Sequence, residues 1–344
     1  MRNYYDMTLT DWQQWVKEQN LPSYRAKQIA AWLPRGINNW AEMSDLPSDL
    51  RHRLTGFFTI DVLRLEHKLV SQIDGTAKYI FRLPDGNIIE SVLLKYHHGQ
   101  SVCISSQAGC RMGCVFCAST GAGFGRNLSH GDMLAQVATI ARDSGDRVGH
   151  VVIMGIGEPL DNYDNLISFL KRVNDPAGLN IGLRHISVST CGLVPEMLKF
   201  TDEGLPVTLS VSLHAPNDEI RRQLMPIARR YGMDDLLAAC RRHIERTGRR
   251  ISFEYSLISG VNDRLDHAKA LVARLKGMLC HVNLIPANEI EGSDFRQSGR
   301  KAVRQFWNCL TRSGINATVR RELGSDIMAA CGQLRRRIEA CENP

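Results

Sequence analysis

Three closely spaced cysteines, Cys110, Cys114 and Cys117, form the most chemically informative pattern in the chain. Structural zinc sites and closed iron–sulfur clusters normally use four protein ligands, so three thiolates leave one corner of a metal site open. A cubane cluster held by three cysteines keeps one iron free for a substrate or cofactor. The alternative is a zinc loop or three unrelated core cysteines, but no nearby cysteine or histidine completes a tetrahedral set with usual zinc-finger spacing. The pattern therefore predicts an open iron–sulfur site.

Polar residues follow several apolar segments that we expect to be strands. Gly157 and Glu158 come shortly after residues 151–154, and glycines at a strand end let a ligand approach the backbone closely. Alone, this pattern is equally typical of a tight turn. Similar positions after later strands are occupied by Ser189, Ser212, Leu213, His214 and Asn288. A histidine after a strand is more often a structural hydrogen-bonding group than a ligand, so these residues become candidates only together with the cysteine loop.

Two further cysteines, Cys103 and Cys331, lie before the cysteine loop and near the end of the chain. If the fold brings them to one site, one thiolate can act as a nucleophile and the other can resolve the adduct. Spacing alone favours the simpler interpretation of two buried cysteines.

The elements that would position these residues are short helices followed by strands. Helical patterns occupy residues 9–18, 25–32 and 48–54, and residues 76–83 and 88–94 predict a hairpin around the turn residues 84–87. Beyond residue 101, apolar strands alternate with helical stretches, the strands being at 148–154, 185–190, 207–213, 251–257, 281–285 and 317–320. This alternation predicts an α/β fold with a parallel sheet, open or curled into a partial barrel.

The amino-acid composition indicates the general class of protein but does not identify a binding partner. The 344 residues are 43% hydrophobic and 23% charged, which is typical of a globular protein. No run of about 18 apolar residues appears, and the first residues lack a signal peptide, so we expect a cytoplasmic protein without a membrane span. The net charge is +7, but arginine pairs such as Arg221 and Arg222 are more typical of solvated helix faces than of binding sites.

The chain resembles the RlmN/Cfr family of radical S-adenosylmethionine (SAM) RNA methyltransferases over nearly its full length. The CxxxCxxC spacing of the cysteine loop is that of radical SAM enzymes. The matching segments are 25–29, 103–110, 157–160, 224–227, 260–263 and 329–334. The last segment, Ala-Ala-Cys-Gly-Gln-Leu, is the most specific, because radical SAM enzymes in general do not carry it.

This resemblance implies a domain order and a set of cofactors. It implies a helical RNA-contacting domain at 1–55, a β-hairpin extension at 56–99, and a radical SAM partial (β/α)6 barrel at 100–344. Cys110, Cys114 and Cys117 would hold a 4Fe-4S cluster, and two SAM molecules would be used per turnover. The implied SAM contacts are Gly157, Glu158, Ser189, Ser212, Leu213, His214 and Asn288. A phosphate-binding role follows, more weakly, for Arg25, Lys27, Arg35, Arg51 and Arg53.

The resemblance also implies a reaction. Cys331 would take a methyl group from one SAM, and the second SAM would give a 5′-deoxyadenosyl radical that abstracts hydrogen from the S-methyl group. The resulting carbon radical would add to C2 of adenine in 23S ribosomal RNA or tRNA. Cys103 would then attack Cys331 and leave a transient disulfide, and either Glu90 or Cys103 would take the C2 proton. The electron donor would be a protein such as flavodoxin or ferredoxin.

Several alternatives stay open at this point. The Cfr branch methylates adenine C8 with the same cysteines, although residues 117–120 look more like the RlmN branch. One further alternative is a non-catalytic RNA-binding protein with a structural metal loop, which would leave Cys331 unexplained. Another is a radical SAM enzyme that acts on a small molecule or peptide, and the family-specific C-terminal cysteine segment argues against it. Ile156 and Ala287 depart from the residues expected beside the SAM contacts without removing a polar group. The sequence leaves the oligomeric state open, with a monomer favoured.

Overall fold

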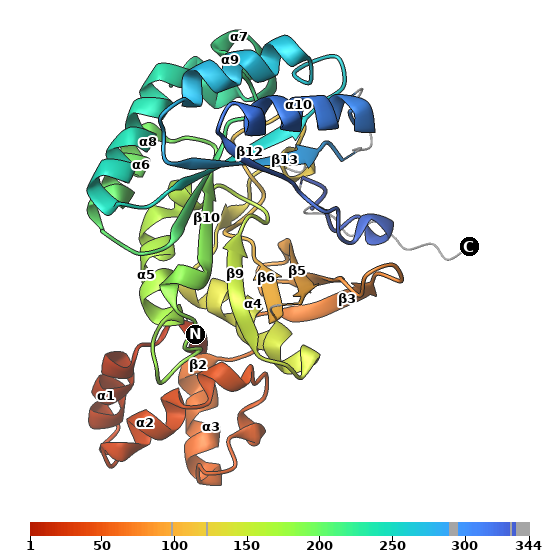
Figure 1. Ribbon diagram of the computed structural model, residues 1–344. Coiled ribbons are helices and arrows are strands. Elements are labelled where there is room, and N and C mark those ends of the chain that lie inside the picture. The colour runs from red at the N-terminus through yellow and green to blue at the C-terminus, as the bar shows by residue number, and fades with distance from the viewer. Residues whose placement is uncertain (98, 122, 289–294, 331, 335–344) are drawn as a thin grey trace.

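One large sheet organises the protein, whose computed structural model describes residues 1–97, 99–121, 123–288, 295–330 and 332–334 (Figure 1). Within these residues, ten strands follow the order β14-β13-β12-β11-β10-β9-β6-β5-β4-β3. Their bounds are β3 Arg64–Val70, β4 Ala77–Arg82, β5 Ile88–Tyr96, β6 Gly99–Cys103, β9 Val148–Ile153, β10 Ile186–Thr190, β11 Thr208–Ser212, β12 Ile251–Leu257, β13 Cys280–Pro286 and β14 Asn316–Val319. Two small sheets pair β1 (Arg2–Asn3) with β2 (Phe58–Thr59) and β7 (Gln107–Ala108) with β8 (Arg126–Asn127).

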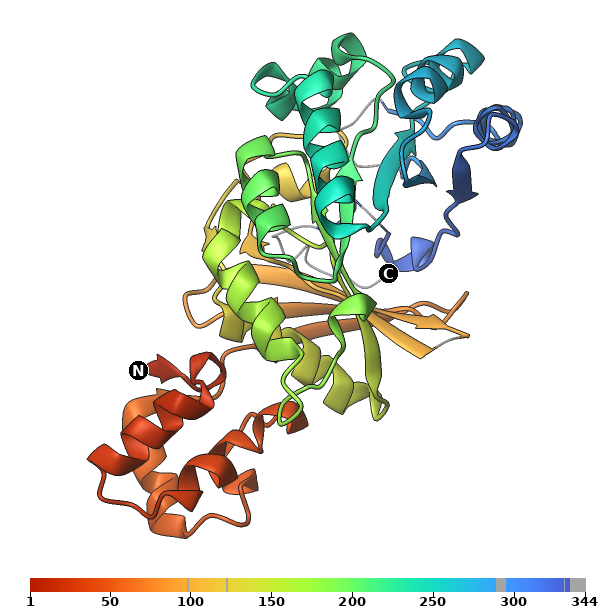
Figure 2. The same cartoon turned by 60° about the vertical axis from the view of Figure 1, so that its left-hand side comes forward.

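The strands from β6 to β14 are parallel, as the alternating pattern predicts. Most of the connecting helices lie on the outer side of the curled sheet, whereas the C-terminal segment lies on its inner side (Figures 1 and 2). The helices are α4 His130–Ser144, α5 Tyr163–Val173, α6 Val194–Asp202, α7 Asp218–Leu224, α8 Met233–Thr247, α9 Leu265–Leu275 and α10 Arg300–Arg312. This arrangement confirms the predicted α/β fold, and β6 adds one described parallel strand to the six that the sequence pattern predicts.

The predicted hairpin is present as β4 and β5, which pair antiparallel. It is continuous with the main sheet, because β5 pairs with β6 on its other side. The register places Lys78, Val92, Cys103 and Val152 in one row across four neighbouring strands. Side chains in such a row point to the same face, so β4 and β5 carry residues directly to the first strand of the barrel.

The N-terminal helices form a separate module below the sheet (Figures 1 and 2). They are α1 Leu9–Glu18, α2 Tyr24–Ala30 and α3 Ser48–Phe57, close to the predicted ranges. Thr8 and Asp11 form a capping box that fixes the start of α1. The module is attached to the barrel helices, since Asp6 accepts a hydrogen bond from the Gly131 backbone and Arg172 donates to the Met7 carbonyl.

No helix in the described part of the chain combines the length and hydrophobicity that crossing a membrane requires. The domain boundaries at residues 55 and 99 stay predictions.

Candidate active site

The three cysteines of the loop line a single cavity of about 580 Å³ at the carboxyl ends of the parallel strands. Cys114 is buried, and Cys110 and Cys117 are half-buried. Gly109 allows the chain to turn into the loop, because it has φ +86° and a side chain there would overlap the Gly123 carbonyl.

The thiols of Cys110 and Cys114 are protonated when no metal centre is bound. Burial, with a smaller contribution from the neighbouring Cys117, raises the pKa of Cys110 to about 12. Burial also raises the pKa of Cys114, with contributions from Cys117 and Cys110. Thiolates form readily when a metal centre binds them, so loading this site should release protons.

The donor set fits a cubane cluster better than a single ion. Among the described residues, no three His, Cys, Asp or Glu side chains converge on one point as the ligands of a zinc ion do. Three cysteines that each bind a different iron of a cube need no such convergence, but they must face one cavity. Cys110, Cys114 and Cys117 meet that requirement and would hold the cluster.

The Gly-x-Gly-Glu segment after β9 forms one wall of the same cavity. Gly157 has φ +109°, and an added Cβ would lie 2.6 Å from the Cβ of Gln107, so the backbone approaches its neighbour too closely for any side chain. Glu158 is buried and accepts hydrogen bonds from the backbone N–H groups of Cys191 at 2.7 Å and Leu160 at 3.1 Å. Burial raises the pKa of its carboxyl group. The segment therefore forms a closely packed wall of the cavity, and two backbone hydrogen bonds hold the Glu158 side chain in place.

His214 lies at the end of β11 in a strained conformation, with φ +53°. Its Nδ1 accepts the backbone N–H of Ser256 at 2.9 Å, and its carbonyl accepts from the Asn262 side chain at 2.7 Å. Because Nδ1 is an acceptor, the neutral ring carries its proton on Nε2. Burial, assisted by Arg221, lowers the pKa of His214 to about 3. The site thus holds a neutral imidazole in one orientation, and strain of this kind is typical of functional positions.

The structure brings together most of the residues for which the resemblance implies SAM binding. Ser189, Ser212 and His214 line the cavity with Gly157, Glu158 and the three cysteines. Leu213 is fully buried and packs in the core beside them. Asn288 lines a neighbouring pocket, which shares Met154 with the cluster cavity.

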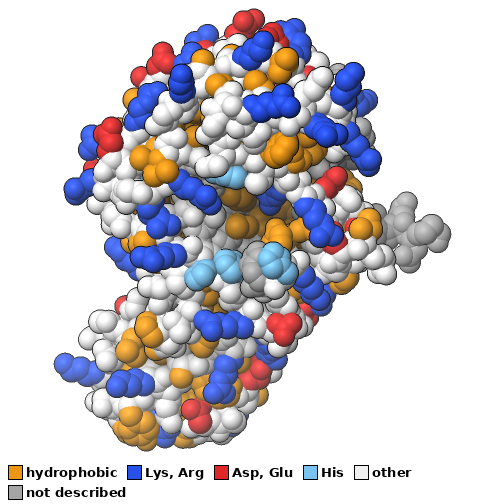
Figure 3. Space-filling model, viewed as in Figure 1, with side chains coloured by type: hydrophobic (Ala, Val, Ile, Leu, Met, Phe, Trp, Pro, Cys, Tyr) orange, Lys and Arg blue, Asp and Glu red, His pale blue; other side chains and the backbone are white. Residues whose placement is uncertain are grey.

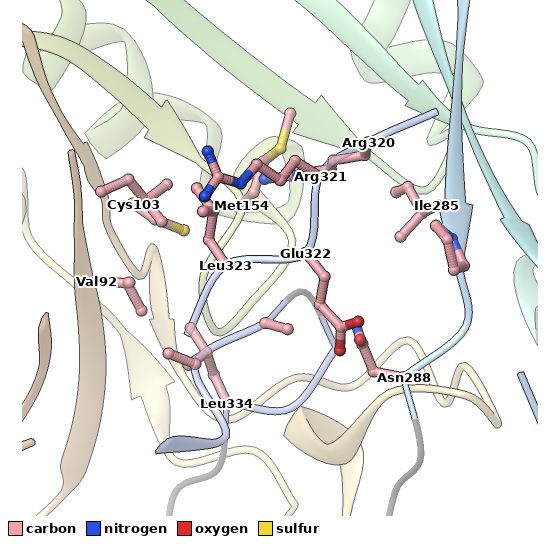
Figure 4. Close-up of a pocket in the computed structure, with 14 residues that line it drawn as sticks. Val92, Cys103, Met154, Ile285, Asn288, Arg320, Arg321, Glu322, Leu323 and Leu334 are labelled. Atoms are coloured by element: carbon pink, nitrogen blue, oxygen red, sulfur yellow. The ribbon is translucent and has the colours of Figure 1, made fainter. Parts of the chain in front are cut away.

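That neighbouring pocket, of about 570 Å³, contains Cys103 (Figure 4). Its surroundings are mainly hydrophobic, with Val92 beside Cys103 and Leu323 nearby, while Asn288 and Glu322 approach each other on the far side. Ala330 also lines this pocket. Cys331 lies outside the described residues, but the residues on both sides of it are described.

The C-terminal segment is fastened to the cluster loop. The backbone N–H of Ala118 donates to the Gly332 carbonyl at 2.8 Å, and the Ser119 hydroxyl donates to the Leu334 carbonyl at 2.9 Å in a buried position. Since Ala118 follows Cys117, these bonds join the chain after Cys331 to the chain after the last cysteine of the loop.

Glu90 lies on β5 and is buried. It is two residues before Val92, so both side chains point to the face of the sheet that carries Cys103. The ammonium group of Lys78 is 3.8 Å from the Glu90 carboxylate and donates to the Met328 carbonyl at 3.4 Å. Lys78 thereby connects Glu90 with the C-terminal segment.

The basic residues expected to contact RNA lie on the N-terminal module. Lys27, Arg35 and Arg53 are exposed, and Arg25 and Arg51 are half-buried. Arg35 stacks on Trp32 at 4.0 Å, and Arg51 donates to the Ala41 carbonyl. Figure 3 shows Lys and Arg side chains on both the module and the barrel, around a hollow whose floor is hydrophobic.

Sequence reasoning missed two charged residues of the interior. The interpretation of Arg221 and Arg222 as a solvated pair is wrong for Arg221, which is fully buried, whereas Arg222 is exposed. Adjacent residues of a helix point in different directions, and α7 packs the face of Arg221 against the barrel. The burial of Lys78 was also missed. Lys78 lies between buried side chains of β4, and nothing in the sequence of this strand indicates that a lysine would face the interior.

The comparisons with known proteins agree with this site. Residues 104–271 match the radical SAM superfamily, and residues 2–60 match the ribosomal RNA large subunit methyltransferase N-terminal domain. A probable dual-specificity RNA methyltransferase RlmN from Clostridium tetani is 50% identical, with 98% of this chain and 97% of the relative covered. The corresponding protein of Alkaliphilus oremlandii is 51% identical, with 96% of each covered.

The same relationship holds for a solved structure, a radical SAM methyltransferase from Sphaerobacter thermophilus. It is 42% identical, has a TM-score of 0.95, and the match covers 98% of this chain and 100% of the other. Similarity over the whole length, including both the N-terminal module and the cluster loop, leads to one conclusion: the chain belongs to the RlmN family of radical SAM methyltransferases.

Proposed function

We propose that this protein methylates C2 of adenine in 23S ribosomal RNA and in tRNA. Support comes from the relatives, which are named dual-specificity RNA methyltransferases, and from the match of residues 2–60 to a ribosomal RNA methyltransferase domain. A buried site requires that the target adenine leave its stack, so loops and incompletely assembled RNA are the expected substrates.

The observation that carries the proposal is the attachment of the C-terminal segment to the cluster loop. Ala118 bonds to Gly332, and Ala330 lines the pocket of Cys103. The chain on either side of Cys331 therefore lies beside both the cluster loop and the second cysteine. This arrangement supports Cys331 as the carrier of the methyl group.

When bound, the cluster and SAM would supply a carbon radical able to remove hydrogen from a methyl group. The protein's own contribution is to hold that methyl group on Cys331 and to release it afterwards. Release requires a second thiolate, and Cys103 is 7% exposed in a hydrophobic pocket, where water is largely excluded. Attack of the Cys103 thiolate on the Cys331 sulfur would form a disulfide and break the carbon–sulfur bond; the carbon attached to the RNA would leave with the electron pair and take a proton to become the methyl group.

We assign the acceptance of the adenine C2 proton to Glu90. Its carboxylate lies on the same face of the sheet as Cys103, and Lys78 holds it from one side. A carboxylate close to the reacting cysteines can take a proton without the involvement of bulk water. A donor such as flavodoxin or ferredoxin and a cytoplasmic location stay predictions from the sequence.

The roles of the two cysteines can be separated by two variants. Cys331→Ala should accept no methyl group from labelled SAM, whereas Cys103→Ala should accept it and then trap a covalent protein–RNA adduct, detected by gel shift and mass spectrometry. Cys309→Ala, on the outer helix α10, is the matched control and should behave as the unaltered protein. Methylation of RNA by the Cys331→Ala protein would refute the proposal.

A further inference from the structure

Arg221 is a buried cation whose partners are incomplete. It lies on α7 with no exposed surface, and its Nη2 donates to the carbonyl of Cys191 at 2.7 Å and toward that of Ser212 at 3.4 Å. Within the described residues, Nε and Nη1 have no hydrogen-bond acceptor. Two of the three nitrogen atoms of the guanidinium group are therefore buried without a partner.

A buried charge in this condition is costly. Removing an ionised group from water costs several kcal/mol unless an opposite charge and hydrogen bonds compensate. Carbonyl oxygens compensate only in part, because they carry no net charge. An unpaired cation that the fold nevertheless keeps indicates that an anion occupies the neighbouring space in the functional protein.

The neighbouring space is the cluster cavity. Cys191 and Ser212, whose carbonyls accept from Arg221, both line it. The cluster loop also touches the end of α7, since the Val115 backbone N–H donates to the Leu224 carbonyl at 3.1 Å. Arg221 is one helical turn before Leu224, so its side chain lies behind the wall of the cavity.

Burial lowers the pKa of Arg221, and Cys191, Cys114 and Asp218 oppose that shift when they are ionised. Cys114 is one of the three cluster cysteines and is itself buried. Three thiolates give a cubane cluster a net negative charge, and the electron that the cluster accepts increases that charge.

We propose that Arg221 is the counter-charge of the iron–sulfur cluster, set behind the cavity wall that Cys191 and Ser212 form, where it stabilises the reduced cluster. A positive charge at this position raises the reduction potential, because it favours the more negative state. It also makes cluster binding more favourable, since the cluster compensates the buried cation. Gly192 allows this placement, because an added Cβ there would lie 3.2 Å from Nη2 of Arg221.

The test compares Arg221→Met, Arg221→Lys and Arg222→Met, each reconstituted anaerobically and titrated by spectroelectrochemistry without SAM. Arg221→Met should shift the midpoint potential to more negative values, Arg221→Lys should retain most of the original potential, and the exposed Arg222→Met should leave it unchanged. Arg221→Gln, which removes the charge but keeps hydrogen-bond donors, should show the same negative shift and keeps the test possible where the methionine variant fails to fold. A potential that is the same in all of these variants and the unaltered protein would overturn the proposal.

A second measurement uses the protein without its cluster. Because methionine removes an uncompensated charge, apo Arg221→Met should unfold at the same temperature as the apo unaltered protein or at a higher one, and it should gain less stability on cluster loading. A large loss of apo stability would instead show that Arg221 is structural. Weaker SAM binding with an unchanged potential would assign the guanidinium to the SAM carboxylate and would also overturn the proposal.

This inference rests on the cluster in the proposed function, but not on the RNA substrate. Unaltered protein that binds no iron and sulfide would refute the cluster itself. A loaded cluster whose potential does not change in the Arg221 variants would refute only the role of this residue, whereas a loaded cluster without RNA methylation would refute only the proposed RNA substrate.

Discussion

The backbone N–H of Ala118 donates a 2.8 Å hydrogen bond to the carbonyl of Gly332, although more than 200 residues separate them. Ala118 follows the last cluster cysteine, and Gly332 follows Cys331. A buried hydrogen bond from Ser119 to the Leu334 carbonyl lies beside it. The two bonds hold the proposed methyl carrier segment against the cluster loop, and they can be weakened without altering any cysteine.

Ser119→Ala should slow methyl transfer to RNA while leaving the iron and sulfide content unchanged. The variant leaves the Leu334 carbonyl without its donor, which costs about 1 kcal/mol and loosens the segment. We expect a several-fold lower single-turnover rate. Ser325→Ala, an exposed position in the same segment, is the control. Equal rates for both variants would show that the attachment has no role in the reaction.

Glu90→Gln should lower the rate of RNA methylation by about 100-fold, because loss of a positioned general base typically has an effect of this size. Methyl transfer to Cys331 and addition to adenine should continue, so the covalent protein–RNA adduct that precedes loss of the C2 proton should accumulate. Rapid quench followed by peptide mass spectrometry measures both quantities. Glu66→Gln, on β3 and separated from β5 by β4, serves as the control and should keep its rate. A Glu90→Gln protein with unchanged turnover would leave Cys103 as the proton acceptor.

Gly157→Ala should weaken SAM binding by roughly tenfold or more, equivalent to about 1.4 kcal/mol. The new Cβ would lie 2.6 Å from Gln107 and push the segment of Glu158 away from the cavity. Gly204→Ala is a matched control, because Gly204 also has a positive φ, of +64°, but has open space around it. Equilibrium binding of SAM to both variants separates backbone strain from steric displacement. Equal losses in the two variants would contradict this account.

His214 should make folding stability depend on pH. Its folded pKa is lowered to about 3, whereas an unfolded histidine titrates near its ordinary value of 6.5. Below pH 6.5 the unfolded state binds a proton that the folded state does not, so stability falls as the pH falls toward 3. Between pH 7.5 and 5.5 this residue should remove on the order of 1 kcal/mol.

Urea denaturation of the apo protein at these two pH values measures the effect. His214→Gln should lose less stability over the interval than the unaltered protein does, whereas the exposed His52→Gln should match the unaltered protein. An identical pH dependence in His214→Gln would show that folding does not lower the pKa of His214.

Local chemistry explains which parts of the fold could be predicted from the sequence. The turn residues between β4 and β5 and the capping residues of α1 act on their own neighbours, so the hairpin and the helix were predicted closely. The cysteine loop was predicted equally well, because only three and two residues separate its successive cysteines along the chain.

Contacts between segments that are far apart in the sequence could not be predicted. The pairing of Cys103 with Val92 depends on the register of β5 and β6, and the hydrogen bond between Ala118 and Gly332 depends on the return of the chain after β14. Arg221 shows the same limit, because a seven-residue helix with two adjacent arginines does not reveal which of them the barrel will cover.

The most direct test of the central claim is mass spectrometry of nucleosides from ribosomal RNA and tRNA incubated anaerobically with the reconstituted protein, SAM and a reductant. The account predicts 2-methyladenosine in both RNAs, and its loss in the Cys331→Ala and Cys103→Ala proteins. Formation of 8-methyladenosine would move the chain to the Cfr type of reaction. No methylated adenosine, despite an intact cluster, would contradict the proposal that RNA is the substrate.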